Sequence, residues 1–255
     1  MTRYTHTDWP NRLFIVRHGQ SAGNIARDAA ETGGLPLIDL QSRDADTPLS
    51  PLGERQAQAL AHWFGEMDRD DRPEVFLTSP FIRSRQTMSA IATALGRAMS
   101  TVHADERLRE KEFGIFDRCT KHGIAAKFPE LAAQRALVGK FYFRPPGGES
   151  WCDVILRLRS VVEELRRDYA GESVVIVSHQ VVVNCFRYLL EQLEENTLLA
   201  IDREADVPNC GVTEYGFTES DHGKRFGLIR ANFVVPLLEA GATVTKAPDR
   251  PAGPK

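Results

Sequence analysis

Residues 13–19 read Leu-Phe-Ile-Val-Arg-His-Gly, a short apolar run that ends abruptly in an arginine, a histidine and a glycine. The apolar residues are large or β-branched and show no polar alternation. This pattern is typical of a strand buried on both faces, as in a parallel sheet. Gly19 lacks a side chain where the backbone turns, and a helix is expected to begin near Ser21. The stretch therefore predicts a strand, a tight turn and a helix in succession.

The same kind of apolar run recurs at Val75–Leu77 and at Val174–Val177. Between and after the runs lie segments with helical apolar spacing or continuous apolar character. The expected helices are Pro51–Met67, capped by Ser50, and Ile82–Leu95, Trp151–Tyr169 and Val181–Leu193. Two late segments, Gly211–Phe217 and Phe226–Phe233, predict further strands. Strands that alternate with helices predict an α/β domain with a mostly parallel sheet.

The composition is that of a globular protein. The 255 residues carry 32 Lys and Arg against 35 Asp and Glu, a formal charge of −3, which argues against a basic nucleic-acid coat. Hydrophobic residues make up 42%, enough to bury a core. The four cysteines are scattered without a Cys-x-x-Cys pair. Neither a disulfide framework nor a cysteine zinc site is expected, and the pattern suits a reducing cytosol.

No targeting segment is recognised in this sequence. Residues 1–12 are polar, and the first apolar run is too short for a signal peptide or a membrane span. We therefore expect a cytoplasmic protein with no membrane partner. Residues 33–48 are rich in Gly, Pro, Asp and Ser and predict a long loop. Residues 241–255 contain several prolines and little that is apolar, which predicts a disordered tail.

Polar side chains follow each of the three apolar runs. Arg17 and His18 follow the first, Arg83 lies one helical turn beyond the second, and His179 follows the third. Because ligands bind beyond the carboxyl ends of parallel strands, these side chains are expected to meet at one edge of the sheet. Two histidines and two arginines that converge from three strands predict an anion site.

The residue types indicate which anion binds. A guanidinium donates two parallel N–H groups to phosphate or carboxylate, and a helix N-terminus, expected near Ser21, favours a phosphate. A neutral histidine beside such a phosphate can attack phosphorus and form a phosphohistidine, which water then hydrolyses. A second, cationic histidine would offset the charge of the transferring oxygens. The pattern predicts phosphoryl transfer.

Several motifs that follow one another in order resemble the histidine phosphatase superfamily, also called phosphoglycerate mutase-like. They are residues 17–24, which carry its Arg-His-Gly signature, and residues 48–57, 79–87, 108–114 and 177–179. Residues 141–150 further resemble a subgroup found in fungi, plants and bacteria. The resemblance implies a three-layer α/β/α sandwich and a single catalytic domain over residues 1–240.

The resemblance also implies roles for individual residues. His18 would accept the phosphoryl group, His179 would assist catalysis, and Glu110 would protonate the leaving oxygen. The side chains that would bind phosphate are Arg17, Asn24, Arg83 and His179. No cofactor and no metal are implied, and the expected ligand is a small phosphorylated substrate, with a phosphoprotein left open and no nucleic acid.

Four residues near these motifs need separate interpretation. Glu112 lies close to Glu110 but has the less suitable spacing to Gly114. Glu149 either supports the site or is simply the acid of a helix N-terminus. Arg85 lies two residues from Arg83 and is expected at the surface. Gln180 stands where the family commonly has glycine, which could narrow the pocket or shift His179.

Three alternatives remain open at this stage. Residues 19–23 fit the Gly-x-Ser-x-Gly elbow of a serine hydrolase, with Ser21 as nucleophile, although few residues precede it. A phosphoglycerate-type mutase would need extra cationic contacts, whereas the stretch from Glu110 to His179 has no adjacent arginine pair before Arg166. A non-catalytic phosphate-binding module is the third. A cysteine phosphatase is disfavoured because Cys152 lacks the required spacing to an arginine.

The substrate itself is not named by the sequence. Phosphosugar, phosphoglycerate, nucleotide and phosphoprotein substrates all remain open. The segments 33–48 and 115–148 are expected to roof the pocket. Candidates for contact with a second anionic group, each more readily explained as a surface charge, are Arg43, Lys121, Lys127 and Arg144.

Overall fold

The computed structural model describes residues 8–219 and 224–246. Its centre is a six-stranded sheet in the order β3-β2-β4-β1-β5-β6. The neighbours β3, β2, β4 and β1 are parallel, whereas β5 is antiparallel to both β1 and β6. The strands are β1 (Arg12–Arg17), β2 (Val75–Thr78), β3 (His103–Ala104), β4 (Ser173–Ser178), β5 (Val212–Thr218) and β6 (Arg225–Phe233). The predicted α/β class with a mostly parallel sheet is confirmed.

The central strands are buried on both faces, as their lack of polar alternation predicted. Leu13 and Ile15 of β1 belong to one apolar cluster, and Phe14 and Val16 belong to the cluster on the opposite face. Because side chains alternate between faces along a strand, a continuous apolar run supplies both clusters at once. Every residue of β4 is buried.

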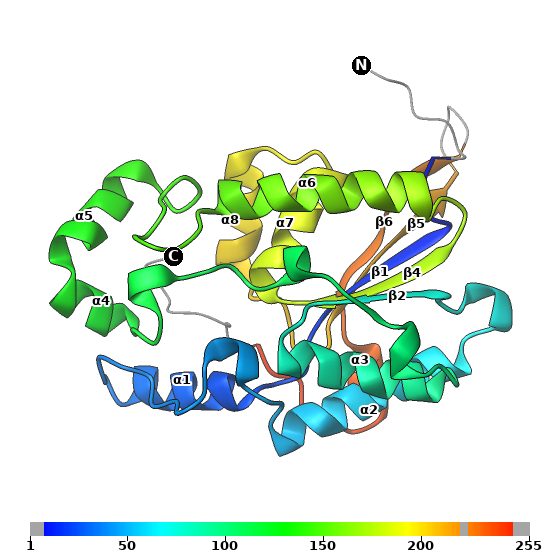
Figure 1. Cartoon of the computed structure of the whole chain (residues 1–255), viewed down its shortest axis with the longest axis horizontal. Helices are drawn as coiled ribbons and strands as arrows, with labels where there is room; N and C mark the ends of the chain where they lie inside the picture. The colour runs from blue at the N-terminus through cyan, green and yellow to red at the C-terminus, as the bar shows by residue number, and fades with distance from the viewer. Residues whose placement is uncertain (1–7, 220–223, 247–255) are drawn as a thin grey trace.

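Helices cover both faces of the sheet and complete a three-layer sandwich (Figure 1). One face packs against α6 (Trp151–Asp168), α7 (Gln180–Leu190) and α8 (Glu195–Glu204). The other face packs against α2 (Pro51–Glu66), α3 (Ile82–Ala94) and α9 (Val235–Glu239). Helix α1 (Ala22–Thr32) lies at the end of the sheet where β1 finishes.

Serine caps fix the beginnings of three helices. The hydroxyl of Ser50 accepts from the Gly53 amide at the start of α2, and Ser21 and Ser150 cap α1 and α6 in the same way. The expected helix Val181–Leu193 begins at Gln180 and ends at Leu190. It ends early because Gln192 adopts a left-handed backbone conformation, with φ of 55°.

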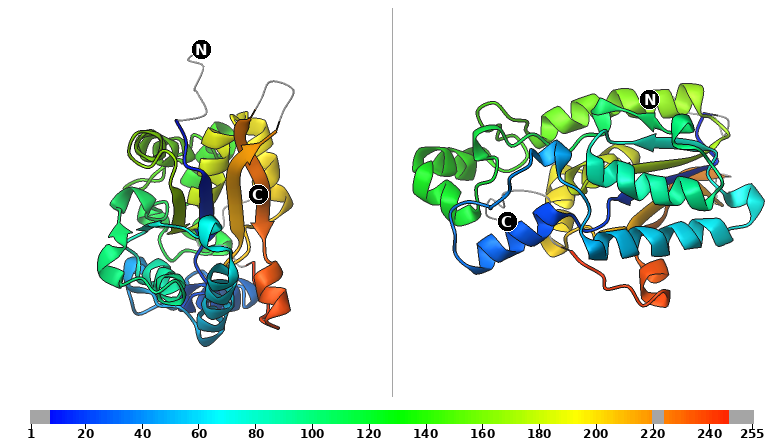
Figure 2. Two further views of the ribbon diagram at one scale, coloured as in Figure 1. Left: turned by 90° about the vertical axis from the view of Figure 1, so that its right-hand side faces the viewer. Right: turned by 60° about the horizontal axis from the view of Figure 1, so that its bottom comes forward.

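Helices α4 (Lys121–Lys127) and α5 (Pro129–Val138) form a cap at one end of the sheet, beyond α8 and next to α1 (Figures 1 and 2). The cap has its own apolar cluster of Phe116, Cys119, Ile124 and Phe143. The hydroxyl and the amide of Thr120 donate to carbonyls in the 33–48 loop, at 2.6 and 3.2 Å. The loop and the cap are therefore joined by hydrogen bonds to loop carbonyls.

The structure corrects the predicted tail at residues 241–246. Ala242 and Val244 pack against the apolar cluster around α2. Thr245 donates from its hydroxyl to the side chain of Asn209, and its carbonyl accepts from the Asn209 amide at 2.9 Å. These apolar contacts and hydrogen bonds give the segment a fixed path that its composition did not indicate. The remaining part of the predicted tail, 247–255, lies outside the described residues.

Candidate active site

The strand order brings the predicted side chains to one edge of the sheet. Because β4 lies between β2 and β1, the residues that follow these three strands are neighbours. The His18 amide donates to the Ser178 carbonyl at 3.0 Å, and the Ser79 amide donates to the Val177 carbonyl at 3.0 Å. The rings of His18 and His179 lie 5.1 Å apart between centroids, at 67° to one another. Both rings are fully buried.

The partners of His18 determine its tautomer. Its Nδ1 lies 2.6 Å from the Gly19 carbonyl oxygen, which can only accept a hydrogen bond. The Nε–H of Arg83 donates to its Nε2 across 3.1 Å. A guanidinium can only donate, so Nδ1 carries the proton and Nε2 presents its lone pair. This is the form in which a histidine can attack phosphorus.

The turn after β1 is packed tightly against the start of α2. A Cβ at Gly19 would come within 2.6 Å of the Gly53 carbonyl oxygen, and a Cβ at Gly53 would come within 1.9 Å of the Gln20 carbonyl oxygen. The Gln20 amide donates to the Gln56 side chain at 2.8 Å. Two glycines thus allow two backbone segments to touch, which fixes the turn that carries His18.

The expected phosphate-binding side chains are all buried. Arg17 donates to the Val207 carbonyl at 2.5 Å. Arg83 donates to His18 and also to the carbonyl and carboxylate of Asp44, at 2.6 and 3.1 Å. Asn24 accepts from the amide and hydroxyl of Ser21, which holds it at the N-terminus of α1. Two guanidiniums and an amide therefore surround the end of β1.

His179 is held on its Nε2 side by two serines. That atom lies 2.8 Å from the Ser79 hydroxyl and 3.4 Å from the Ser84 hydroxyl. The ring of Phe81 meets the imidazole edge to face, with centroids 5.0 Å apart. These contacts fix the plane of the ring beside His18.

Glu110 lies on a segment that reaches the same edge of the sheet. Glu110 is 1% exposed, whereas the Glu112 side chain is 53% exposed. The Ser178 hydroxyl donates to the Leu108 carbonyl at 2.7 Å, so the segment is tied to the end of β4. The Lys111 amide donates to Glu110 Oε1 at 2.8 Å.

Glu149 supports this segment from the start of α6. Its carboxylate accepts from the Glu112 amide at 3.0 Å and from Arg157 at 3.0 and 3.2 Å. Arg157 in turn donates to the Arg109 carbonyl at 2.8 Å and to the Glu110 carbonyl at 3.3 Å. Of the two interpretations of Glu149, these contacts favour the one in which it supports the segment that carries Glu110.

A cleft lies between α1, the 33–48 loop and the segment 113–118 that leads into the cap. Asn24 and Arg83 line it, so it reaches the predicted phosphate site. Arg27 and Arg118 line it as well, and neither was predicted from the sequence. Arg27 lies one turn after Asn24 on the same helix face, a spacing that could have indicated it. Arg118 has a left-handed φ of 58° in a loop, which no local pattern indicates.

The cationic residues considered for a second anionic group lie elsewhere. Arg43 is 80% exposed and pairs with Asp46, and Arg144 is 63% exposed and pairs with Asp153. Lys121 and Lys127 are exposed. Arg85 is exposed as predicted.

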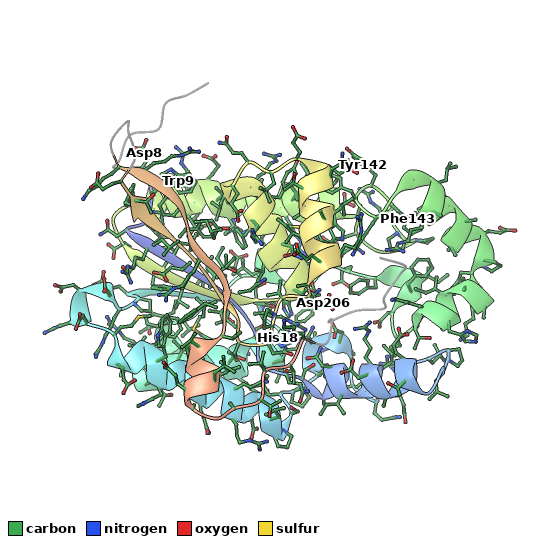
Figure 3. The ribbon with its side chains drawn as sticks, turned by 180° about the vertical axis from the view of Figure 1, so that it is seen from behind. Asp8, Trp9, His18, Tyr142, Phe143 and Asp206 are labelled. Carbon is green, nitrogen blue, oxygen red and sulfur yellow. The ribbon has the colours of Figure 1, made fainter. Side chains whose placement is uncertain are left out.

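The side chain of Gln180 is buried and donates to the Asp206 carboxylate at 2.7 Å. Figure 3 shows His18 near α1 and Asp206 in the segment that follows α8.

At this edge of the sheet, the contacts support neither a cysteine nor Ser21 of the Gly-x-Ser-x-Gly motif as the nucleophile. Burial raises the pKa of the Cys210 thiol and that of the Cys185 thiol well above the ordinary value of a cysteine. Ser21 hydrogen-bonds with Asn24 and acts as a helix cap with extended backbone. Within residues 8–219 and 224–246, no group of three His, Cys, Asp or Glu side chains could hold a metal ion, and no helix could span a membrane.

The chain matches the histidine phosphatase superfamily (branch 1) over residues 13–226, and it belongs to that superfamily. The resemblance seen in the sequence motifs is thereby confirmed. The superfamily and its phosphatase and mutase-like relatives support a phosphatase or a mutase.

Relatives of both kinds are similar to this chain. It is 31% identical over 179 residues to a 6-phosphofructo-2-kinase/fructose-2,6-bisphosphatase of Caenorhabditis elegans, a match that covers 69% of this chain and 33% of that protein. It is 28% identical over 209 residues to a probable phosphoglycerate mutase of Yersinia enterocolitica, covering 82% and 86%. A mycobacterial glucosyl-3-phosphoglycerate phosphatase, solved with inorganic phosphate, superimposes with a TM-score of 0.65 at 26% identity, covering 89% and 99%.

Proposed function

We propose that this protein is a phosphomonoester hydrolase that works through a phosphohistidine on Nε2 of His18. The observation that carries the proposal is the tautomer of His18. Its Nδ1–H is bound by the Gly19 carbonyl, and its Nε2 lone pair faces the guanidinium of Arg83. A nucleophile with its lone pair beside a phosphate-binding group is the arrangement that phosphoryl transfer requires.

In the first step the Nε2 lone pair forms a bond to phosphorus while the ester P–O bond breaks. Glu110 gives its proton to the leaving oxygen, which departs as an alcohol. The Gly19 carbonyl stabilises the positive ring of the phosphohistidine through the Nδ1–H bond. In the second step water attacks phosphorus, Glu110 takes the proton of the water, and the P–N bond breaks to release inorganic phosphate.

The buried cations serve the transferring group. The guanidinium of Arg83 and the ring of His179 lie beside His18, and with the buried Arg17 they offset the charge of the three phosphoryl oxygens, with Asn24 at the adjoining helix N-terminus. Burial strengthens these interactions because the local dielectric constant is low. The substrate is a small phosphorylated molecule whose leaving group lies in the cleft of Arg27 and Arg118. The four free thiols suit a reducing compartment, and we place the activity in the cytoplasm.

The partners of the cationic side chains that could bind a second anionic group favour hydrolysis over mutase activity. Arg43 and Arg144 pair with neighbouring carboxylates at the surface and do not line the cleft. Of the two arginines that do line it, Arg118 donates to the carbonyls of Leu40 and Ser42, and Arg27 lies 3.9 Å from the Glu31 carboxylate. A mutase needs extra cationic contacts to retain a bisphosphate between its two half-reactions. Conversion of 3- to 2-phosphoglycerate without release of phosphate would instead identify a mutase.

Radiolabelled substrate and rapid acid-free quenching test the proposal. Wild-type protein is expected to hold an acid-labile phosphoryl group that His18→Ala lacks, with steady-state turnover reduced at least about 10³-fold in the variant. Label that is acid-stable, or labelling of Ser21 by a fluorophosphonate, would contradict the mechanism. Absence of turnover on a broad metabolite panel by wild type would favour a phosphate-binding module.

Glu110→Gln and Glu112→Gln test the general acid as a matched pair. Glu110→Gln is expected to lower kcat about 10²–10⁴-fold on alkyl phosphates and much less on p-nitrophenyl phosphate, whose leaving group needs no proton. Glu112→Gln is expected to stay within about threefold on both, because its side chain is exposed. The reverse ranking would reassign the acid to Glu112.

A further inference from the structure

All three nitrogens of the Arg83 guanidinium have assigned partners. Nε donates to His18 Nε2 at 3.1 Å, Nη1 donates to the Asp44 carbonyl at 2.6 Å, and Nη2 donates to the Asp44 carboxylate at 3.1 Å. The Arg83 side chain is 2% exposed, and the Asp44 side chain is 39% exposed. One residue from the 33–48 loop therefore binds Arg83 through both its main chain and its side chain.

The two edges of the guanidinium have different partners. A planar guanidinium has an end edge, formed by Nη1 and Nη2, and a side edge, formed by Nε and Nη2. Asp44 occupies the end edge, while the side edge faces the attacking nitrogen of His18. Nη2 carries two hydrogens, so one can bind Asp44 while the other stays parallel to the Nε–H. A phosphoryl group on His18 can then be bound by the side edge without loss of the Asp44 contacts.

We propose that Asp44 is a positioning residue, which orients the side edge of Arg83 toward the phosphoryl group transferred to His18. The proposal rests on the proposed function. An arginine side chain has several rotatable bonds, and a contact on its far edge removes the rotation that would otherwise misalign the near edge. The Phe81 ring lies 5.0 Å from the guanidinium carbon and restricts a further direction.

The loop holds Asp44 in place through contacts that do not involve Arg83. The Thr47 amide donates to the Asp44 carbonyl at 3.2 Å, which closes a short helical turn over Asp44–Asp46. Arg118, at the edge of the cap, donates to the carbonyls of Leu40 and Ser42 at 2.8 and 2.9 Å. These contacts connect the edge of the cap, through the loop, to the guanidinium that faces the nucleophile.

Asp44→Ala and Asp46→Ala test the proposal as a matched pair. Both carboxylates lie on the same turn, but Asp46 binds the exposed Arg43 and leaves Arg83 untouched. Asp44→Ala is expected to lower kcat on p-nitrophenyl phosphate about 10–100-fold with KM changed less than about threefold. Asp46→Ala is expected to change kcat less than about twofold. Asp44→Asn keeps an acceptor oxygen and is expected to recover part of the loss.

A double-mutant cycle separates positioning from a structural role. In an Arg83→Ala background, Asp44→Ala is expected to change the remaining kcat less than about twofold, because nothing is left to orient. A loss of the same size in both backgrounds would show a structural role and overturn the proposal. An unchanged kcat in Asp44→Ala would also overturn it. A lower KM together with tighter inhibition by inorganic phosphate would show that Asp44 competes with substrate.

The phosphorylation of His18 in wild type distinguishes this proposal from the one it rests on. If wild-type protein does not form the phosphohistidine in a single turnover, the proposed function fails. If wild type and Asp44→Ala both form it at the same rate, the function stands and the role of Asp44 is wrong. Slower formation of the phosphohistidine in Asp44→Ala than in wild type supports both the proposed function and the role of Asp44.

Discussion

Asn209 donates from Nδ2 to the carbonyl of His18 across 3.1 Å. The same side chain accepts from the Thr245 hydroxyl at 2.9 Å, and that hydroxyl accepts from Gln56 at 3.0 Å. Gln56 also accepts from the Gln20 amide, just after His18. A segment near the carboxyl end of the described chain therefore supports the turn that carries the proposed nucleophile.

Thr245→Val is expected to lower kcat about 3–10-fold and to reduce the free energy of unfolding by about 1–3 kcal/mol. The substitution keeps the shape of the side chain but removes a hydroxyl that satisfies both Gln56 and Asn209, so buried polar groups lose a partner. Steady-state kinetics and urea unfolding measure the two effects.

Thr243→Val is the control for that change. Gln56 binds Thr243 through its main-chain carbonyl, at 2.7 Å, which the substitution retains. Its kcat and stability are expected to stay near wild type. Equal losses in both variants would show that the segment tolerates no valine and would remove the specific role of the Thr245 hydroxyl.

Arg83→Lys is expected to lower kcat about 10²-fold although it preserves the positive charge. A lysine ammonium cannot donate in parallel from a rigid plane, so it cannot bind Asp44 and also meet the phosphoryl group. Single-turnover phosphorylation of His18 measures the loss. Arg85→Lys, two residues on and exposed, is the control and is expected to leave the rate unchanged. Comparable rates for Arg83→Lys and wild type would show that charge alone suffices.

Local patterns predicted the parts of the fold and site that depend on few residues. The length and residue types of the apolar run before Arg17 favoured a strand buried on both faces over a short buried helix, and topology then places His18 and His179 at one edge. Ser50 was recognisable as a cap, and the start of a helix was recognisable near Ser21, because a cap acts within one helical turn.

Contacts between distant segments were not predictable in this way. Asp44 and Arg83 are 39 residues apart, and an aspartate in a loop of Gly, Pro, Asp and Ser carries no signal of its partner. Thr245 and Asn209 are 36 residues apart, and the composition around Thr245 resembles that of a disordered tail. Such partners are selected by tertiary packing, which local propensity does not encode.

Glu149→Gln is expected to lower Tm by about 3–6 °C at pH 7, and the difference is expected to vanish in acid. Burial raises the pKa of Glu149, but hydrogen bonds and charge from Arg157, the Glu112 amide and Arg109 outweigh burial, so the pKa lies below its ordinary value. A depressed carboxylate pKa stabilises the fold above the unfolded pKa near 4.5, and this contribution is lost as pH falls through the folded pKa.

Glu112→Gln is the comparison variant, for which we expect an effect on stability of the opposite sign. Partial burial, with the nearby carboxylates, raises the pKa of Glu112 despite Arg109. Its ionised form therefore disfavours the fold at neutral pH, and the glutamine variant is expected to be equal to wild type or slightly more stable there. Thermal unfolding from pH 7 to pH 3 follows both variants. A Glu149→Gln difference that persists unchanged at the acid end would show that its charge is not the cause.

Gly53→Ala is expected to destabilise the protein by at least about 3 kcal/mol and to lower kcat more than about tenfold. A Cβ at this position would lie 1.9 Å from the Gln20 carbonyl oxygen and 2.9 Å from the Gln20 nitrogen, so backbone must move on the turn that carries His18. Gly65→Ala, in the same helix, meets only ordinary contacts beyond 3.4 Å and is expected to gain about 0.5–1 kcal/mol from helix propensity. Urea unfolding and steady-state kinetics compare the pair. If both alanines stabilise the helix equally, the close approach of α2 to the His18 turn does not constrain the site.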